Sequence, residues 1–192
     1  MSLNDELVRV GITGHVFCAP VGTTLPDDVT TDLDPAFVEV GLISEDGLTE
    51  SLDVTKELLR AWQRPAGVRT LTTEVNWTWQ FVCEETSPIV LDLYYGNSTT
   101  GSTTTGGVST TTIPAWPSST EKAWVIQVED GDIITRYTIP KGDVTDRGET
   151  KHVFSDGTMY DITVAVLGTS VDEMGTRLTN DPEFAFQVAS AS

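Results

Sequence analysis

Few residues of this 192-residue chain have the types and spacing that catalysis requires. His15 lies in an apolar stretch and His152 lies near an expected turn, and neither has the spacing of a metal ligand. A structural or solvated role is the expected one for both. No Gly-x-Ser-x-Gly motif marks a hydrolase nucleophile. The sequence therefore predicts that the chain is not an enzyme and has no metal or cofactor site.

A group of aspartates is the nearest approach to a cation site. Asp27, Asp28, Asp32 and Asp34 are close in sequence, but the Asp-x-Asp-x-Asp-Gly order with a closing Glu is absent. We therefore expect a solvated acidic loop, in which Asp34 caps the turn that opens at Pro35.

The charge balance limits the binding partners. The net charge is −18, from 29 acidic against 11 basic residues. Because proteins gain affinity for duplex DNA by neutralising phosphates with Lys and Arg, this balance argues against tight DNA binding. The apolar runs are too short to span a bilayer, and the N-terminus lacks the features of a signal peptide. We expect a protein that is made in the cytoplasm and contacts no membrane.

The two cysteines do not indicate a disulfide framework. Cys18 and Cys83 both lie in segments with the pattern of strands. In that setting a buried free thiol is favoured over a bridge, so two packed thiols are expected.

Hydrophobic alternation predicts most of the secondary structure. From residue 70 to residue 84, apolar side chains such as Trp77, Trp79 and Phe81 alternate with polar ones, which is typical of a two-faced strand. Asp-Gly pairs favour tight turns between several of the strands. The predicted strands are residues 8–18, 38–44, 48–55, 70–84, 122–129, 132–139 and 158–167. Residues 1–192 are thus expected to form a single, mainly β domain, an antiparallel β-sandwich or barrel.

One flanking helix is expected among the strands. Ser87 can cap it, Pro88 fits its first turn, and Gly96 can supply the left-handed residue that ends it. The alternation of Ile89, Leu91, Leu93 and Tyr95 also fits a strand. The capping residues favour the helix.

A long Thr- and Gly-rich segment, residues 97–119, interrupts the strand pattern. Its first half has almost no apolar side chain and no charge, so burial cannot offset the entropy of ordering it. We expect a surface loop. Trp116, held between prolines, is expected to anchor the loop on its own domain, with a contact to a neighbouring subunit as the alternative.

Several short segments, taken in order, indicate a family. GHVFCAP at residues 14–20, TTLP at 23–26, DPAF at 34–37 and GLISEDGLTES at 41–51 follow one another. Ala61-Trp62, VRT at residues 68–70 and GTRL at residues 175–178 continue the series. This order resembles the major tail tube proteins of long-tailed, non-contractile bacteriophages. The resemblance implies a sandwich with a flanking helix, which agrees with the alternation.

The resemblance also implies a function. Members of this family form hexameric rings that stack into a hollow tube through which genome DNA passes. Carboxylates repel phosphates, and small polar groups hydrate a wall without holding the duplex, so a polar and acidic strand face suits such a channel. The candidate lumen-lining residues are Thr72, Glu74, Asn76, Thr78, Gln80, Gln127, Glu129, Asp161 and Thr163.

Stacking of rings requires a second, head-to-tail contact. The resemblance assigns it to the N-terminal arm, residues 1–6, and to the stretches 20–35 and 56–67. The candidate stacking residues are Leu3, Pro20, Leu25, Pro26 and Trp62. The implied partners are other copies of the chain, the tape measure protein, the tail terminator and the distal tail proteins. The implied location is the virion tail, assembled in the host cytoplasm.

Two other classes of protein fit parts of the sequence. A β-sandwich that binds carbohydrate or mediates adhesion would use exposed aromatics, for which Trp77, Trp79, Trp116 and Trp124 are candidates. A phage decoration protein is a further alternative. In a solitary domain the polar strand faces would meet only water.

Overall fold

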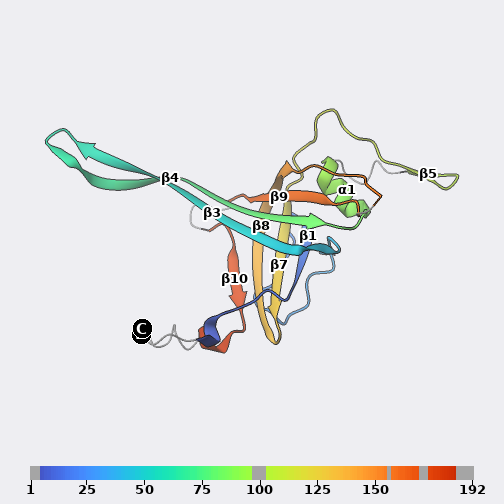
Figure 1. The fold of residues 1–192 in the computed structure, drawn as a ribbon, viewed down its shortest axis with the longest axis horizontal. Coiled ribbons are helices and arrows are strands. Elements are labelled where there is room, and N and C mark those ends of the chain that lie inside the picture. Colours follow the sequence, from blue (N-terminus) through green and yellow to red (C-terminus); the bar gives the residue numbers. More distant parts are fainter. Residues whose placement is uncertain (1–4, 97–102, 155–156, 169–172, 185–192) are drawn as a thin grey trace.

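The chain folds into a sandwich-like body from which one hairpin projects (Figure 1). The computed structural model describes residues 5–96, 103–154, 157–168 and 173–184. The strands of the main sheet are β1 (Thr13–Pro20), β2 (Val38–Glu39), β3 (Ile43–Ala61), β4 (Arg64–Cys83), β7 (Lys122–Asp130), β8 (Ile133–Arg147), β9 (Tyr160–Val166) and β10 (Thr176–Thr179). A short 3-10 helix, Asp5–Leu7, precedes them.

The sheet is antiparallel and its two ends stay open. Its order is β2-β1-β7-β8-β9-β4-β3, with β10 paired to β8. Because the described part of the chain contains no pairing between β2 and β3, the sheet is not closed into a barrel. The prediction of a mainly antiparallel β fold with one helix is confirmed, in its sandwich form.

The core lies where β4 and β9 pack across β1, β7 and β8. The rings of Phe81 and Trp124 lie 6.3 Å apart, and those of Trp79 and Tyr137 lie 4.7 Å apart. Alternate residues of β9 are buried, as the sequence pattern predicts, whereas in β7 the four consecutive residues 123–126 are all buried. Ile162 of β9 is also fully buried.

The structure contains the helix α1 (Pro88–Tyr95), which confirms the helix that the capping residues predict. The Ser87 hydroxyl accepts a hydrogen bond from the Val90 N–H at 3.3 Å. Gly96 has a φ of 62° and donates its N–H to the Asp92 carbonyl. Val90 and Leu93 pack into the core, so the helix covers one end of the sandwich.

Several predicted boundaries are wrong. Residues 8–12 lie outside β1, and residues 40–42 separate β2 from β3. Asp46-Gly47 does not end a strand: β3 continues through it with a bulge, at which Gly47 has a φ of 72° and the register with β4 shifts. The short β10 has no counterpart among the predicted strands.

Residues 56–67, where no strand was predicted, form the end of a long hairpin of β3 and β4. β4 pairs with β9 only from Thr78 to Cys83, and in the described structure residues 64–77 pair only with β3. The far ends of β3 and β4 therefore leave the body as a two-stranded ribbon (Figure 1). Trp62 lies at its turn.

The segment 97–119 is also only partly a loop. It contains a small hairpin of β5 (Thr103–Thr105) and β6 (Val108–Thr110), with Gly106 and Gly107 at positive φ in the turn. The expectation that Trp116 anchors the segment is wrong, because this side chain is 89% exposed. Ser118 and Thr120 hold the end of the segment instead, through bonds to Gly96 and Asp143.

Candidate assembly and channel surfaces

One group of predicted lumen residues shares the outer face of β4 and β9. Gln80 pairs with Thr163 across the two strands, and its Nε2 donates to both carboxylate oxygens of Asp161 at 3.0 Å. Trp79 and Phe81, on either side of Gln80, point into the core. Strand alternation therefore directs Gln80 outward.

The same face continues along the hairpin. Asn76 donates through Nδ2 to the Glu74 carboxylate at 2.8 Å, and Thr78 lies between Asn76 and Gln80 on this face. We call the set Glu74, Asn76, Thr78, Gln80, Asp161 and Thr163 the β4–β9 polar face.

Sequence reasoning missed the contribution of β3 to this face. The partners of Gln80, Thr78, Asn76 and Glu74 across the ladder share their side of the sheet. These partners are Thr49, Ser51, Asp53 and Thr55. The signal was present in the sequence, since polar residues alternate with Leu48 and Leu52 in the strand predicted at residues 48–55.

Thr72 does not share the β4–β9 polar face. Thr55 pairs with Glu74, but the next residue, Lys56, pairs with Thr72, so Thr73 is the extra residue of a bulge. Consecutive residues of β3 face opposite sides. The bulge therefore moves Thr72 to the side opposite Glu74.

Gln127 and Glu129 lie on the other outer surface of the sandwich. Gln127 accepts two bonds from the buried Arg136 guanidinium and donates to Glu129 at 2.6 Å. Because β4 and β7 contact each other through their buried faces, their outer faces point in opposite directions. The structure thus separates these two residues from Gln80 and Asp161.

The acidic loop near Gln127 is a structural element. Arg136 donates to the carbonyls of Asp28 and Thr31 and so fastens the loop to β8. The Asp28 carboxylate accepts bonds from Thr31 and Thr30, and these bonds lower the pKa of Asp28. Asp34 caps its own turn by accepting from the Ala36 N–H, which is the role predicted for it.

The candidate stacking residues fall into two places. Pro20, Leu25 and Pro26 lie at the end of β1 and in the following loop, where Leu25 and Pro26 are half-buried. Trp62 is fully exposed at the far end of the hairpin. Leu3 lies outside the described residues.

The hairpin carries many exposed apolar side chains, which its two strands cannot bury. A two-stranded ribbon has no core of its own, and large exposed apolar surfaces mark contact sites. Besides Trp62, the exposed residues are Leu52, Val54, Leu58, Leu59, Val68, Leu71 and Val75. The hairpin is therefore the strongest candidate for an assembly contact.

Comparison with known families decides the class of protein. The family model described as "Phage tail tube protein" matches residues 1–189. The chain belongs to this family. It is therefore a structural component of a bacteriophage tail, and the resemblance to tail tube proteins seen in the sequence is confirmed.

The other comparisons of this tail tube protein give matches among solved structures. No curated protein matches the sequence. Among solved structures, a chain of "Cryo-EM structure of the anti-feeding prophage (AFP) baseplate, 6-fold symmetrised" is similar, with 14% identity and a TM-score of 0.45. The match covers 93% of this chain and 97% of that one.

The interior of the tail tube protein contains the two predicted thiols. Cys18 and Cys83 are buried and unbridged, as expected. Burial raises the pKa of Cys18 to about 11 and that of Cys83 to about 12. Both thiols are therefore protonated at neutral pH and act as small apolar groups.

The aromatic residues proposed for an adhesive face are mostly in the core. Trp79 and Trp124 are buried, and Trp77 packs against the core cluster. Only Trp116 of that set is exposed. Within the ranges that the structure describes, no group of three or more His, Cys, Asp or Glu side chains is placed to hold a metal ion, and no helix is long and apolar enough to cross a membrane.

Proposed function

We propose that this tail tube protein forms hexameric rings that stack head to tail into the hollow tube of a long, non-contractile tail. Genome DNA passes through the lumen of this tube during ejection. The observation that carries the proposal is the family match over residues 1–189. The open sheet supports it, because β2 and β3 leave strand edges that a neighbouring copy can pair with or cover.

The β4–β9 polar face is the surface that suits the lumen best. It presents the carboxylates of Glu74 and Asp161 among hydroxyl and amide groups, and it contains no Lys or Arg. Such a wall repels phosphates and stays hydrated, so DNA slides along it without being held. β3 adds Asp53 to the same face.

The other predicted lumen-lining residues allow a test of whether the β4–β9 polar face lines the lumen. Gln127 and Glu129 face the opposite way, and a bulge turns Thr72 away. Because one ring presents one side of the sandwich to its axis, the two outer faces cannot both line the same lumen.

Two single substitutions distinguish the faces. Glu74→Lys and Glu129→Lys change the charge by the same amount, and each change is repeated in every subunit of the tube. We expect both variants to form tubes, and we expect only Glu74→Lys to slow DNA ejection from purified particles. Slow ejection with Glu129→Lys alone would assign the lumen to the other face. Normal ejection with both would remove the lining proposal.

The partners follow from the position in the tail. Other copies of the chain form the ring and the stack. The tape measure protein inside the tube, and the tail terminator and distal tail proteins at its ends, complete the set. Under this proposal the protein is assembled in the host cytoplasm and ends in the virion tail, which is the location that its family supports.

A further inference from the structure

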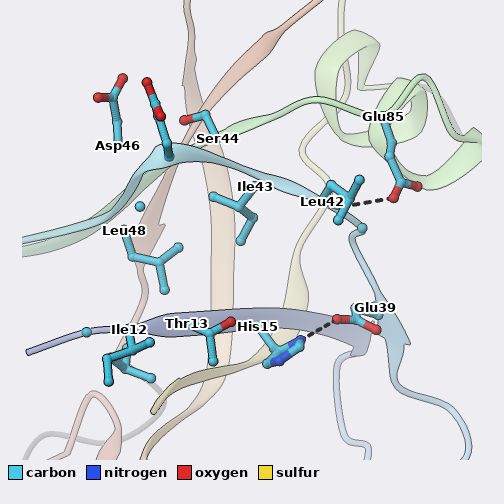
Figure 2. A pocket seen from close by; sticks show the side chains of 16 residues that line it. Ile12, Thr13, His15, Glu39, Leu42, Ile43, Ser44, Asp46, Leu48 and Glu85 are labelled. Carbon is cyan, nitrogen blue, oxygen red and sulfur yellow. Dashed lines mark hydrogen bonds and ion pairs between the residues drawn. The ribbon is translucent and has the colours of Figure 1, made fainter. Parts of the chain in front are cut away.

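A groove opens between the two layers of the body, beside the first half of β1 and the start of β3. Its volume is about 640 Å³, within the range of pockets that hold small ligands. Figure 2 shows Ile43 and Leu48 directed from β3 toward β1, where Ile12 and His15 form the opposite wall. We call this feature the β1–β3 groove.

The rim of the β1–β3 groove is acidic. Glu39 is paired with His15 at 2.6 Å, and the Glu85 carboxylate accepts the Leu42 N–H at 3.0 Å (Figure 2). Glu45 and Asp46 are exposed on β3 and have no hydrogen bond or ion pair to any described residue. The rim thus holds two carboxylates without partners beside apolar walls.

The groove also lies beside unpaired strand edges. β1 pairs with β2 only at Phe17 and Cys18, and β3 is the last strand of the sheet. The Val16 carbonyl accepts the Val40 N–H on the side away from β7, and Gly14, two residues earlier, faces the same side with no ladder partner among the described residues. An extended segment entering the groove can use such edges.

The tip of the long hairpin has the complementary character. We call residues 56–69 the distal hairpin. Its charged residues are Lys56, Glu57, Arg60, Arg64 and Arg69. It thus contains four of the 11 basic residues and only one of the 29 acidic ones, and is locally basic in a chain of net charge −18.

Three of these basic side chains have no partner among the described residues. Lys56, Arg60 and Arg69 are exposed and form no hydrogen bond or ion pair with the residues that the structure describes. Trp62 and Leu58 add exposed apolar surface beside them. The distal hairpin therefore carries unpaired positive charge and an aromatic anchor, and the groove carries unpaired negative charge and an apolar wall.

We propose that the distal hairpin of one copy docks in the β1–β3 groove of a second copy. The contact must join two copies, because the ribbon carries its tip away from the body that holds the groove (Figure 1). The positive tip is attracted to the acidic rim although two whole copies repel each other, so the charges select the orientation of docking. This inference rests on the proposed function and specifies one contact of the assembly.

The geometry of such a contact agrees with a tube. The hairpin and the groove are different surfaces of one chain, so the contact is heterologous and each copy can offer both halves. A heterologous contact closes into a ring or continues as an open stack, depending on the rotation. It does not stop at a dimer.

Charge exchange tests the proposal. The tip variant is Arg60→Glu with Arg69→Glu, and the groove variant is Glu45→Lys with Asp46→Lys. All four side chains are exposed, so both variants are expected to fold. Each variant alone has like charges on tip and groove, and we expect it to stay unassembled at concentrations where the wild type sediments as rings or tubes. In an equimolar mixture, every contact between one variant and the other joins opposite charges, so we expect the two variants to alternate and assembly to return.

A matched control separates this contact from net charge. Asp132→Lys with Glu149→Lys changes the total charge by the same amount as the groove variant at exposed sites away from the groove. This control keeps both the basic tip and the acidic groove, so it is expected to assemble alone, whereas the groove variant is not. Assembly of the tip or groove variant alone, or no assembly in their mixture while the wild type assembles, would overturn the docking contact and leave the proposed function in place. Failure of the wild type itself to assemble would overturn both.

Cross-linking gives a second measurement that does not depend on charge. Leu42→Cys and Gln63→Cys in one chain place a thiol at the groove and a thiol at the tip, while Trp62 is kept and the native Cys18 and Cys83 are buried. Mild oxidation of the assembled variant should give a ladder of covalent multimers. The pair Ile113→Cys and Gln63→Cys is the control and should give none. A ladder from the control but not from the groove pair would contradict the docking site.

Discussion

The strands β3 and β4 run through both the sandwich body and the long projecting hairpin, and their side chains have different surroundings in the two regions. In the body, Trp79 and Phe81 of β4 are buried against Tyr137 and Trp124. In the hairpin, Val75 and Leu71 of the same strand are exposed. The strand β4 therefore contributes to the buried core at one end and to an exposed apolar surface at the other.

This difference shows that alternation predicts a strand without predicting its partner. Four apolar residues of β4 lie at alternating positions of the same sequence pattern: Leu71, Val75, Trp79 and Phe81. Only the last two have a second layer of the same chain to pack against. Under the proposed assembly, the apolar residues of the hairpin contact another copy, so the two regions should respond to mutation in different ways.

The largest expected effect is on the stability of the body. Phe81→Ala removes a side chain that is 1% exposed and in contact with Trp124, and the cavity left behind should lower the free energy of unfolding by about 3–5 kcal/mol. Leu59→Ala in the hairpin is the comparison. Its side chain is 47% exposed, so a change within about 0.5 kcal/mol is expected. Urea unfolding of the unassembled chain measures both, and equal losses would remove the distinction between the regions.

Trp62→Ala should weaken assembly while leaving the stability of the unassembled chain almost unchanged. Trp62 is 100% exposed, so its removal should change the free energy of unfolding by no more than about 0.5 kcal/mol. If it anchors a contact between copies, the loss is about 2 kcal/mol or more for each contact, which raises the concentration needed for assembly roughly thirty-fold. Sedimentation velocity over a concentration series measures this shift. Unchanged assembly would show that the tip is not an anchor.

A smaller effect is expected where the two ends of the described chain meet. Arg9 donates from Nε and Nη2 to the Asp181 carboxylate at 2.8 and 2.9 Å, and this pair lowers the pKa of Asp181. A lowered pKa in the folded state contributes stability above the unfolded pKa of about 3.9, and this contribution is lost as the pH falls through the folded value. Asp181→Asn should therefore lower the melting temperature at neutral pH.

The pH dependence is the specific part of this prediction. The difference in melting temperature between the wild type and Asp181→Asn should shrink as the pH falls below about 4. Asp132→Asn serves as the control, because the exposed Asp132 side chain has no partner among the described residues. A difference that stays constant with pH would show that the Arg9 pair does not stabilise the fold.

The smallest effect is expected for the second hairpin. Deletion of residues 103–110 removes β5 and β6, which pair only with each other in the described structure and bury little surface. The protein should stay folded and assemble as before, because exposed segments of this kind tolerate deletion. Circular dichroism melting and electron microscopy check the two parts. Loss of tubes with an unchanged melt would give this hairpin a role in assembly.

The sequence predicted the parts of the fold that depend on local chemistry. Ser87, Pro88 and Gly96 mark the helix because caps act within one turn, and the alternation around Trp79 and Ile162 follows the burial of one strand face. No strand was predicted at residues 56–67, because this two-stranded ribbon has no second layer to bury one of its faces and so has no burial pattern of its own. The bulge at Thr73 also left no sequence signal, and it moved Thr72 to the other face.

The candidate surfaces were also predicted only in part, because alternation describes a single strand and not the arrangement of several strands. Outward residues of one strand, such as Gln80 and Asn76, follow from alternation alone. Whether two strands share an outer face depends on how the sheet folds over its core. The sequence therefore joined Gln127 to Gln80, and the structure places them on opposite surfaces.

The most direct test of the central claim is a cryo-electron microscopy reconstruction of the assembled protein at a resolution that shows strands. We predict hexameric rings stacked into a hollow tube, with the β4–β9 polar face toward the lumen and each distal hairpin in contact with another copy. A protein that stays monomeric at every concentration, or a tube whose lumen is lined by the face of Gln127 and Glu129, would contradict this account.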